Sequence, residues 1–265
     1  MVSARANDTM DKFIIQGSYS TPLRHVSWSS RRFPAFAFYL RLSSVIIKAS
    51  RLAKKGAYSD EDWVKSSRAT IDLLEMVGVS VEMENISAIS GLDSPCVFVG
   101  NHMSVLETFV LPCIIQPHIK FAFVVKESLT NYPVFKHVMR SRDPIVVGRA
   151  NPREDFKKVL EGGLKRLNQG ISVLIFPQTT RTTELDPKAF NSIGIKLAKK
   201  AGVPVIPFAL KTDAWGTGRW VKDFGKIDPS KRVRFWFGNP ITIRGRGKDE
   251  HEAVLQFIIE KLKTV

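Results

Sequence analysis

From about residue 79 onward, short apolar runs alternate with segments whose apolar residues recur at helical spacing. The apolar runs are VSVEMENI, CVFVGN, KFAFVV, PIVVGR, ISVLIFP, VPVIPFAL and RVRFWFGNP. Alternation of this kind favours parallel strands covered by helices on both faces. We therefore predict an α/β fold with a mostly parallel mixed sheet that is flanked by helices.

The same pattern divides the chain into three parts. Residues 1–32 are polar and rich in Ser and Arg, so we predict a loosely ordered N-terminus. Residues 33–78 carry two helical patterns, and the second begins near Ser59 and Asp62. Residues 79–265 form the α/β domain. A chain of 265 residues with 44% hydrophobic residues can bury the core that this domain needs.

The charge of the chain indicates the kind of partner it binds. There are 40 Lys and Arg residues against 25 Asp and Glu, which gives a net charge of +15. Such a surface attracts polyanions, namely nucleic acid, anionic lipid or phosphorylated substrates. The two cysteines, Cys96 and Cys113, lie in apolar runs without metal-type spacing. We expect both to be core thiols in a reducing compartment.

The segment from Pro34 to Lys55 has the pattern of an amphipathic helix. No uncharged run in the chain reaches the roughly 18 residues that a membrane span needs. On a helix, Arg41, Lys48 and Lys55 line up on one side, and the other side carries Tyr39, Leu42, Val45, Ile46 and Ala49. We predict that residues 33–78, a helical pair, associate with a membrane surface through this segment. The alternative is a helix that packs on the domain.

The stretch VFVGNHMSVLETFVLP, residues 97–112, places polar side chains at the seam between a strand and a helix. Residues five apart on a helix are turned by about 140° from each other, so His102 and Glu107 meet only if His102 lies in the turn. One interpretation is a catalytic His–carboxylate pair with Asn101 beside it. The other is a capping box, in which Ser104 is the N-cap, Glu107 is at N3 and the histidine is incidental. These residues alone leave both interpretations open.

Basic residues follow three further strand-like runs. Lys126 follows KFAFVV, Arg149 is the last residue of PIVVGR, and Arg181 lies shortly after ISVLIFP. Each of them alone has the default interpretation of a solvated surface charge. The carboxyl ends of parallel strands share one edge of a sheet, however, so these cations could converge with His102 on one cleft. Such a cleft suits a phosphorylated substrate with a neighbouring hydroxyl that must lose its proton.

Taken together, these motifs resemble those of the glycerolipid acyltransferases. NHMSVLE is similar to the Asn-His-x4-Asp/Glu motif of that family, IFPQTTRT to its Phe-Pro-Glu-Gly-Thr-Arg-Ser motif, and VPVIPFAL to its Val-Pro-x-x-Pro block. The segment KESLTNYPVFKHV with PIVVGR resembles the segment that carries a Lys and then an Arg. The similarity extends from residue 96 to about residue 210.

The resemblance implies a function and a set of roles. The family transfers a fatty acyl group from an acyl thioester, acyl-CoA or acyl-ACP (acyl carrier protein), to the sn-2 hydroxyl of lysophosphatidic acid, which gives phosphatidic acid in phospholipid biosynthesis. His102 and Glu107 would be catalytic. The substrate-binding residues would be Asn101, Lys126, Arg149, Pro177, Gln178, Thr179, Thr180 and Arg181. No cofactor beyond the thioester carrier is expected, and no metal.

Four positions depart from the family pattern. Glu107 replaces the usual Asp, which one further methylene accommodates. Gln178 stands where Glu is typical and keeps hydrogen-bonding capacity without the negative charge. Thr179 stands where Gly is typical and removes the freedom to adopt a positive φ. Asn191 occupies a place that is often filled by Lys.

The expected partners are therefore a membrane phospholipid surface, lysophosphatidic acid and the acyl carrier, with no nucleic acid. The early residues, with Asp8 and Asp11, lack a secretion-signal pattern, so we expect a peripheral, monotopic protein on the cytoplasmic face of the membrane. One alternative is an acyltransferase for another acceptor, namely glycerol 3-phosphate, another lysophospholipid or a lyso-aminolipid. Another is a non-catalytic basic protein that binds membrane or nucleic acid. The aromatic clusters lie in strand-like runs, which argues against nucleic acid.

Overall fold

The computed structural model of the protein describes residues 17–178, 180–219 and 221–264. Its strands form one sheet of eight in the order β1-β2-β8-β7-β3-β6-β4-β5. The strands are β1 (Tyr19–Ser20), β2 (Val81–Glu84), β3 (Val97–Gly100), β4 (Phe121–Lys126), β5 (Ile145–Val147), β6 (Ser172–Ile175), β7 (Val205–Lys211) and β8 (Val233–Phe237). Only the β1–β2 and β7–β8 pairs among these are antiparallel. The predicted α/β class with a mostly parallel mixed sheet is confirmed.

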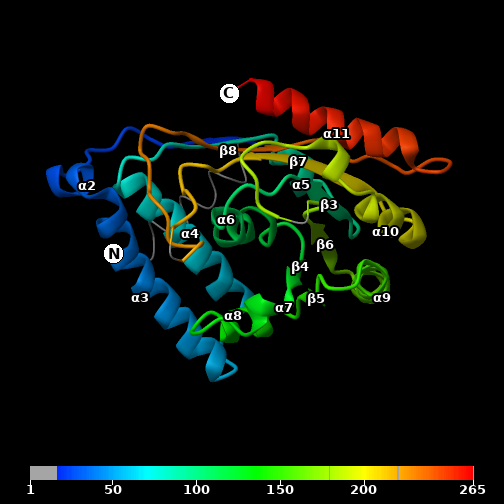
Figure 1. The fold of residues 1–265 in the computed structure, drawn as a ribbon, viewed down its shortest axis with the longest axis horizontal. Coiled ribbons are helices and arrows are strands. Elements are labelled where there is room, and N and C mark those ends of the chain that lie inside the picture. Colours follow the sequence, from blue (N-terminus) through cyan, green and yellow to red (C-terminus); the bar gives the residue numbers. More distant parts are fainter. Residues whose placement is uncertain (1–16, 179, 220, 265) are drawn as a thin grey trace.

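Helices cover both faces of this sheet (Figure 1). They are α2 (Trp28–Arg32), α3 (Pro34–Lys54), α4 (Asp60–Met76), α5 (Ser87–Ser90), α6 (Leu106–Ile115), α7 (Glu127–Thr130), α8 (Lys136–Ser141), α9 (Pro152–Asn168), α10 (Ile193–Ala201) and α11 (Lys248–Lys263), with a 3-10 turn η1 at Pro187–Ala189. Local signals set several ends. Ser59 and Asp62 form a capping box at the start of α4, and Asn151 caps α9 ahead of Pro152.

The alternation of side chains along each strand divides the core into two layers. Phe98 of β3 belongs to the layer that packs against α4 and α6, together with Leu74 and Val110. Its neighbours Val97 and Val99 belong to the opposite layer, which packs against α9, α10 and α11. The sheet is therefore buried on both faces, and its loops at the carboxyl ends of the strands are left to form a site.

Both cysteines lie in the core, as predicted. Cys96 and Cys113 are free thiols and are buried. Burial raises the pKa of Cys96 to about 12 and the pKa of Cys113 to about 11. Both thiols are therefore protonated and unreactive at neutral pH.

The described part of the N-terminal segment differs from the expectation. Residues 1–16 lie outside the described residues, whereas residues 17–32, for which we predicted loose order, contain β1 paired with β2 and helix α2. The pairing of Tyr19 with Met83 gives this segment backbone partners that composition does not reveal.

Helix α3 has the predicted bounds but presents a different face to the domain. Leu42 and Ala49, which we assigned to the membrane side, are buried, and the Tyr39 hydroxyl donates to the carbonyl of Gly225 at 2.6 Å. The assignment is wrong for this side because α4, α8 and Trp215 offer it an apolar surface to pack on.

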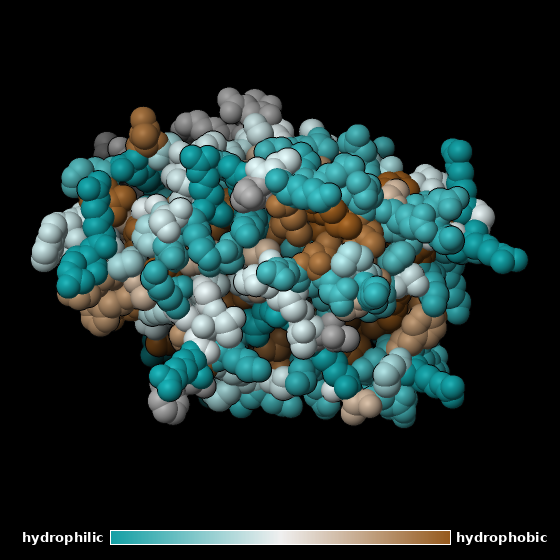
Figure 2. All heavy atoms as spheres, turned by 45° about the horizontal axis from the view of Figure 1, so that its top comes forward, coloured by the Kyte–Doolittle hydropathy of each residue, from teal (hydrophilic) through white to brown (hydrophobic). Residues whose placement is uncertain are grey.

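A second apolar stripe of α3 is exposed instead. Phe33, Phe36, Leu40 and Ile47 are 53%, 70%, 59% and 41% exposed. Their spacing of three, four and seven residues places them on one side of the helix. Within the part of the chain that the structure describes, no helix is long and apolar enough to cross a bilayer. The face of the molecule drawn in Figure 2 is mostly hydrophilic, and hydrophobic atoms show there mainly in recesses.

We expect Gly100→Ala to lower the free energy of unfolding by about 1–3 kcal/mol. Gly100 ends β3, and a Cβ there would lie 2.3 Å from Cε2 of Phe208, a fully buried ring. Equilibrium unfolding in urea measures the change. Gly91→Ala is the matched control, because the nearest atom to its Cβ is 3.8 Å away. Equal losses in the two variants would contradict the steric argument.

Candidate active site

Five of the predicted site residues come together at one edge of the sheet. Because β3, β6, β4 and β5 are mutually parallel, the segments that follow them lie side by side. His102, Lys126, Arg149, Pro177 and Gln178 all line one pocket of about 140 Å³. The strand-end pattern predicted one cleft for His102, Lys126, Arg149 and Arg181; the first three line this pocket, whereas Arg181 lines a second pocket that also contains His102.

His102 and Glu107 meet in the turn between β3 and α6. Nδ1 of His102 lies 2.7 Å from Oε2 of Glu107, whose side chain is fully buried, while the imidazole is 13% exposed. A carboxylate only accepts, so Nδ1 carries the proton in this contact and Nε2 keeps its lone pair. Among the described residues Nε2 has no hydrogen-bond partner. The imidazole is therefore held in the tautomer that can take a proton from a ligand.

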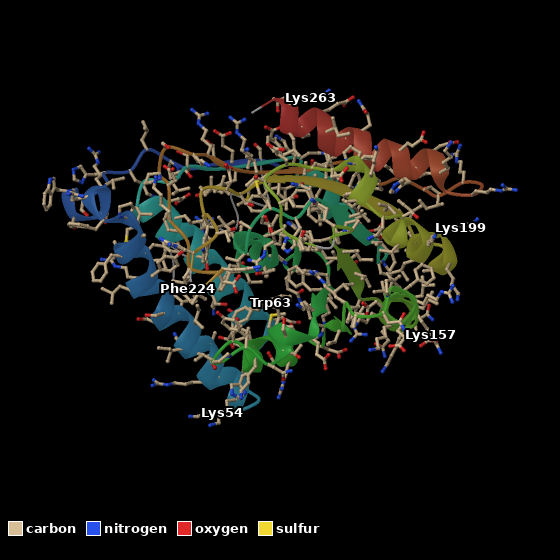
Figure 3. The ribbon with its side chains drawn as sticks, viewed as in Figure 1. Lys54, Trp63, Lys157, Lys199, Phe224 and Lys263 are labelled. Atoms are coloured by element: carbon tan, nitrogen blue, oxygen red, sulfur yellow. The ribbon has the colours of Figure 1, made fainter. Side chains whose placement is uncertain are left out.

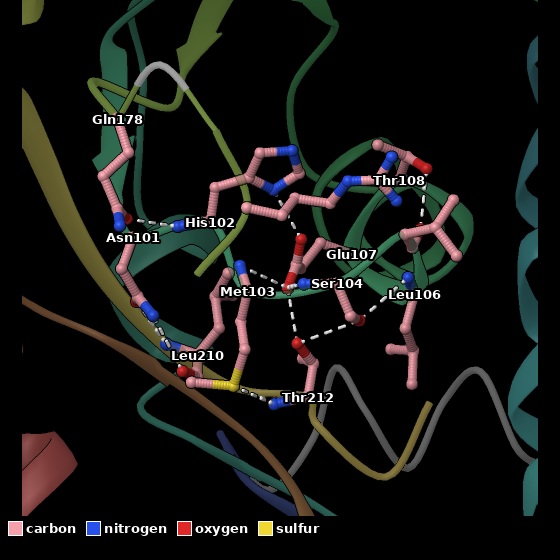
Figure 4. A network of polar contacts seen from close by, with 12 residues as sticks. Asn101, His102, Met103, Ser104, Leu106, Glu107, Thr108, Gln178, Leu210 and Thr212 are labelled. Carbon is pink, nitrogen blue, oxygen red and sulfur yellow. Dashed lines mark hydrogen bonds and ion pairs between the residues drawn. The ribbon is translucent and has the colours of Figure 1, made fainter. Parts of the chain in front are cut away.

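The other carboxylate oxygen of Glu107 is fixed by the turn itself (Figure 4). Oε1 accepts from the backbone N–H groups of Met103, at 3.0 Å, and Ser104, at 2.7 Å, and from the hydroxyl of Thr212. The sequence left open whether Glu107 caps the backbone or pairs with His102. Glu107 does both, since one oxygen accepts from the N–H groups of the turn and the other orients the imidazole.

The start of α6 differs from the predicted capping box. The helix begins at Leu106 and its N-cap is Val105, which makes no side-chain capping hydrogen bond. Ser104 lies one residue earlier, and its hydroxyl accepts from the N–H of Leu106 at 3.1 Å and donates to the Thr212 hydroxyl at 3.1 Å. The prediction that Ser104 is the N-cap is wrong, because the turn that holds Glu107 against His102 delays the helix by a residue.

An aromatic ring fixes the plane of the imidazole. Phe176 stacks on His102 with ring centroids 4.2 Å apart and an interplanar angle of 14°. The rings of Phe176 and Phe208 pack edge to face, with their centroids 5.8 Å apart. The stack leaves His102 little freedom to rotate, which is what a group that acts on a bound ligand requires.

The loop after β6 is bonded to the backbone of His102. Gln178 is only 5% exposed, its Oε1 accepts from the His102 N–H at 2.7 Å, and its Nε2 donates to the Thr182 hydroxyl at 2.8 Å. The backbone N–H of Thr182 donates to the carbonyl of His102 at 3.0 Å. The amide of Gln178 uses both a donor and an acceptor here, so the departure from Glu has a structural account.

The other predicted residues of this loop have different surroundings. Pro177 is buried, and its carbonyl accepts from the Asn191 amide. Thr180 is exposed, and Thr179 lies outside the described residues. Asn191, at a position often filled by Lys in the family, therefore closes the loop instead of supplying a charge.

Asn101 does not face the pockets. Its side chain is 2% exposed, its Nδ2 donates to the carbonyl of Leu210 at 3.0 Å, and its Oδ1 accepts from the Leu210 N–H at 2.8 Å. The amide thereby extends the β3–β7 ladder by one residue. We assign Asn101 a positioning role, in place of the substrate contact that the resemblance implied.

The cations lie around His102 in different settings. Arg149 has a positive φ of 61°, and its N–H and that of Gly148 donate to the Asp155 carboxylate at 2.7 and 2.8 Å. Burial and the nearby Arg181 lower the pKa of the Arg149 guanidinium. Arg181 in turn pairs with Asp223, with Nη1 and Oδ1 2.7 Å apart. Lys126, the last residue of β4, is exposed.

A second, larger pocket shares the His102 side chain. It has about 300 Å³ of interior space and a mostly apolar lining from α3, α6, the segment around Tyr132 to Phe135, and the segment around Trp215 to Phe224. Arg181 and Asp223 are its charged members. His102 therefore lines both a polar pocket with Lys126 and Arg149 and a larger, mostly apolar pocket of the kind that binds hydrophobic ligands.

Sequence reasoning missed Phe176, Thr212 and Asp223. Phe176 directly follows β6, which ends at Ile175, and Thr212 directly follows β7, which ends at Lys211. The search for side chains at strand ends that found Lys126 could therefore have found both. Asp223 lies in a loop without a recognisable pattern. In the described part of the chain, no group of three His, Cys, Asp or Glu side chains is placed to hold a metal ion.

Comparisons with known proteins agree with this geometry. A family model described as Acyltransferase matches residues 78–211. The 1-acyl-sn-glycerol-3-phosphate acyltransferase of Pseudomonas aeruginosa is 31% identical over 57% of this chain and 58% of its own length. A chloroplastic 1-acyl-sn-glycerol-3-phosphate acyltransferase of Brassica napus is 28% identical over 52% and 38%. The match therefore spans 58% or less of these two relatives.

A solved structure shares the fold. The crystal structure of the 1-acyl-sn-glycerophosphate acyltransferase of Thermotoga maritima superposes with a TM-score of 0.67 and 20% identity, over 88% of this chain and 95% of that one. At this identity the likeness concerns the fold alone.

We expect Asn101→Asp to lower the free energy of unfolding by about 2–4 kcal/mol, because an aspartate oxygen would face the carbonyl of Leu210 in a buried position. Urea unfolding monitored by circular dichroism gives the value. Asn131→Asp serves as control, since Asn131 is exposed and its Oδ1, which accepts from Arg140, is preserved. A loss below about 0.5 kcal/mol in Asn101→Asp would refute the positioning role.

Proposed function

The chain belongs to the acyltransferase family, and we propose that it transfers a fatty acyl group from an acyl thioester to the sn-2 hydroxyl of lysophosphatidic acid, which gives phosphatidic acid. The names of the relatives from Pseudomonas aeruginosa and Brassica napus support this acceptor. The observation that carries the proposal is the contact of 2.7 Å between His102 Nδ1 and Glu107 Oε2, in a histidine that lines both pockets.

His102 acts as general base in this reaction. Its Nε2 takes the proton of the acceptor hydroxyl, and the hydroxyl oxygen forms a bond to the carbonyl carbon of the thioester. The C–S bond then breaks, and the imidazolium returns its proton to the departing thiolate, so that protons balance. The nucleophile belongs to the substrate, and no acyl group is carried by the protein.

Glu107 acts through His102. Its Oε2 holds the Nδ1–H, which fixes the tautomer and stabilises the imidazolium that forms during proton transfer. The three donors on Oε1 keep the carboxylate in place, because the turn and Thr212 would have to move with it. Gln178 and Asn101 position the backbone on either side of His102 and touch no substrate in this mechanism.

The cations around His102 hold the phosphate of the acceptor. Arg181 is close enough to Arg149 to lower the pKa of its guanidinium, and Lys126 lines the pocket that Arg149 shares with His102. A guanidinium binds phosphate oxygens through two parallel N–H groups, so Arg149 and Arg181 fix the head group while its free hydroxyl faces Nε2. Much of the acceleration is then positioning.

Acyl chains occupy the part of the apolar pocket that continues into the smaller cavity below α3. Five of its lining residues, Ile46, Thr108, Phe109, Phe135 and Met139, also line a smaller cavity below α3, so the hydrocarbon space extends under this helix. The acyl donor is acyl-CoA or acyl-ACP, and the reaction uses no other cofactor. The basic surface, with a net charge of +15, suits either acidic carrier.

The exposed stripe on α3 supports binding to a membrane surface. Phe33, Phe36, Leu40 and Ile47 would enter the boundary between head groups and acyl chains, with Arg31, Arg32, Lys48 and Lys54 close to anionic lipid. Val134 and Phe224, also exposed, belong to the two segments that pack on α3. We propose that the protein is peripheral, on the cytoplasmic face, with the helical pair of residues 33–78 as its contact and the α/β domain of residues 79–265 as its catalytic part.

We expect the wild type to release thiol from palmitoyl-CoA in micelles only when lysophosphatidic acid is present. His102→Ala should reduce this rate on the order of 10²–10⁴-fold, because the general base is lost. A thiol reagent measures the release, and mass spectrometry identifies phosphatidic acid.

His25→Ala is the matched control, because His25 is exposed and touches neither pocket. It should keep the full rate. Thiol release that continues in His102→Ala would refute the role of this residue, and a wild type that is silent with CoA and carrier-protein donors would refute the activity.

Phe36→Asp should weaken binding to vesicles with anionic lipid about tenfold or more, since a buried phenyl group contributes about 1.5–3 kcal/mol at an interface. Vesicle sedimentation measures the partition. Ala253→Asp, on an exposed position of α11, changes the net charge equally and should have little effect. Equal losses in both variants would indicate that charge alone governs binding and would contradict insertion of α3.

A further inference from the structure

The apolar pocket contains one ion pair, and its carboxylate has no role in the proposed reaction. Oδ1 of Asp223 lies 2.7 Å from Nη1 of Arg181, the side chains being 19% and 29% exposed. Within the described residues, Oδ2 of Asp223 has no hydrogen-bond partner. An acid therefore stands directly beside the guanidinium that is proposed to hold the phosphate of the acceptor.

The backbone around Asp223 is fixed, so this acid cannot easily move away. The Asp223 carbonyl accepts from Nε1 of Trp215 at 3.0 Å, and the Gly216 N–H donates to the backbone carbonyl of Lys226 at 2.9 Å. A Cβ on Gly225 would lie 1.9 Å from the carbonyl oxygen of Gly216, which shows how closely the two sides of this loop approach. Tyr39 of α3 bonds the Gly225 carbonyl and anchors the loop to the helix.

A fixed carboxylate changes which head groups fit. A phosphomonoester with two negative charges is attracted by Arg181 and Arg149 but repelled by Asp223. A phosphodiester carries one negative charge, so the repulsion is smaller. If a positive group lies a few bonds from that phosphate, it can pair with Oδ2 of Asp223 while the phosphate pairs with Arg181.

The rings around Asp223 suit a positive group. Tyr39, Tyr132 and Phe224 all line the pocket with Asp223, and the Tyr39 and Phe224 rings lie 5.4 Å apart. Phe224 lies beside α3 in Figure 3. Tyr132 lines the same pocket as both members of the pair, and burial and the charge of Asp223 raise the pKa of its phenol. Aromatic faces beside a carboxylate attract ammonium groups.

We propose that Arg181 and Asp223, with the rings of Tyr39, Tyr132 and Phe224, bind the head group of a lysophospholipid that joins a phosphodiester to an ammonium group. This inference rests on the proposed acyl transfer and widens its acceptors from lysophosphatidic acid to zwitterionic lysophospholipids. Asp223 is then a specificity-determining residue. It favours the ammonium group and disfavours the doubly charged phosphate.

Soluble head groups test the site without catalysis. Calorimetry on the full chain compares glycerophosphoethanolamine with glycerophosphoglycerol, which has the same phosphodiester and a neutral alcohol in place of the ammonium. We expect the ammonium compound to bind about fivefold more tightly, the factor that a partly exposed ion pair gives. Equal affinities in the wild type would overturn the proposal, and this comparison needs no variant.

Two variants locate the effect. Asp223→Asn should abolish the preference and tighten the binding of glycerol 3-phosphate. Asp228→Asn is the matched control, since it removes the same charge from the same loop but bonds Ser230 and Lys226 and lines neither pocket. It should retain the preference. A preference that survives in Asp223→Asn would overturn the proposal.

Acylation identifies the substrate class. The wild type is assayed with lysophosphatidic acid and with lysolipids that carry ethanolamine, choline or glycerol head groups. Faster acylation with ethanolamine than with glycerol supports hydrogen bonding to Asp223, and faster acylation with choline supports contact with the rings. Rates that are equal for all three diesters would overturn the inference. If no lysolipid is acylated, the proposed function fails, whereas the head-group comparison still decides the site.

Discussion

The buried carboxylate of Glu107 is the contact on which the rest of the site depends. One oxygen orients His102, and the other accepts from the backbone of Met103 and Ser104 and from Thr212. The two N–H donors follow β3, and Thr212 follows β7. Glu107 therefore connects the ends of two strands that are more than a hundred residues apart in the sequence. A buried carboxylate tolerates no missing partner, because an unpaired charge there costs several kcal/mol. The fold must therefore bring both strand ends to it, and that requirement places the imidazole as well.

Local patterns predicted the parts of this site that local structure determines. The strand ending at Gly100 and the five-residue spacing of His102 and Glu107 are readable from sixteen residues, and parallel strands bring Lys126 and Arg149 to the same edge. The resemblance to a family of acyltransferases is confirmed by the match over residues 78–211. The ring of Phe176 and the acid Asp223 were not predicted, since their contacts join separate segments and depend on packing that no periodicity encodes. Asn101 was predicted to bind substrate, but its side chain extends the sheet by bonding the backbone of Leu210. A polar residue at a strand end therefore does not by itself indicate a ligand contact.

Helix α3 illustrates why an amphipathic pattern does not identify its partner. The helix is apolar on two sides, and the hydrophobic effect does not distinguish a protein surface from a bilayer. The side with Leu42 and Ala49 is buried in the domain, whereas the stripe of Phe36 and Leu40 is exposed. The arrangement makes α3 a wall of the apolar pocket and an outer surface at the same time.

His102 lines both the polar pocket and the apolar pocket. If each pocket holds part of a different substrate, donor and acceptor must be bound together before the proton moves, since the proposed mechanism stores no acyl group on the protein. The steady-state kinetics are then sequential, and double-reciprocal plots at different acceptor concentrations intersect instead of running parallel.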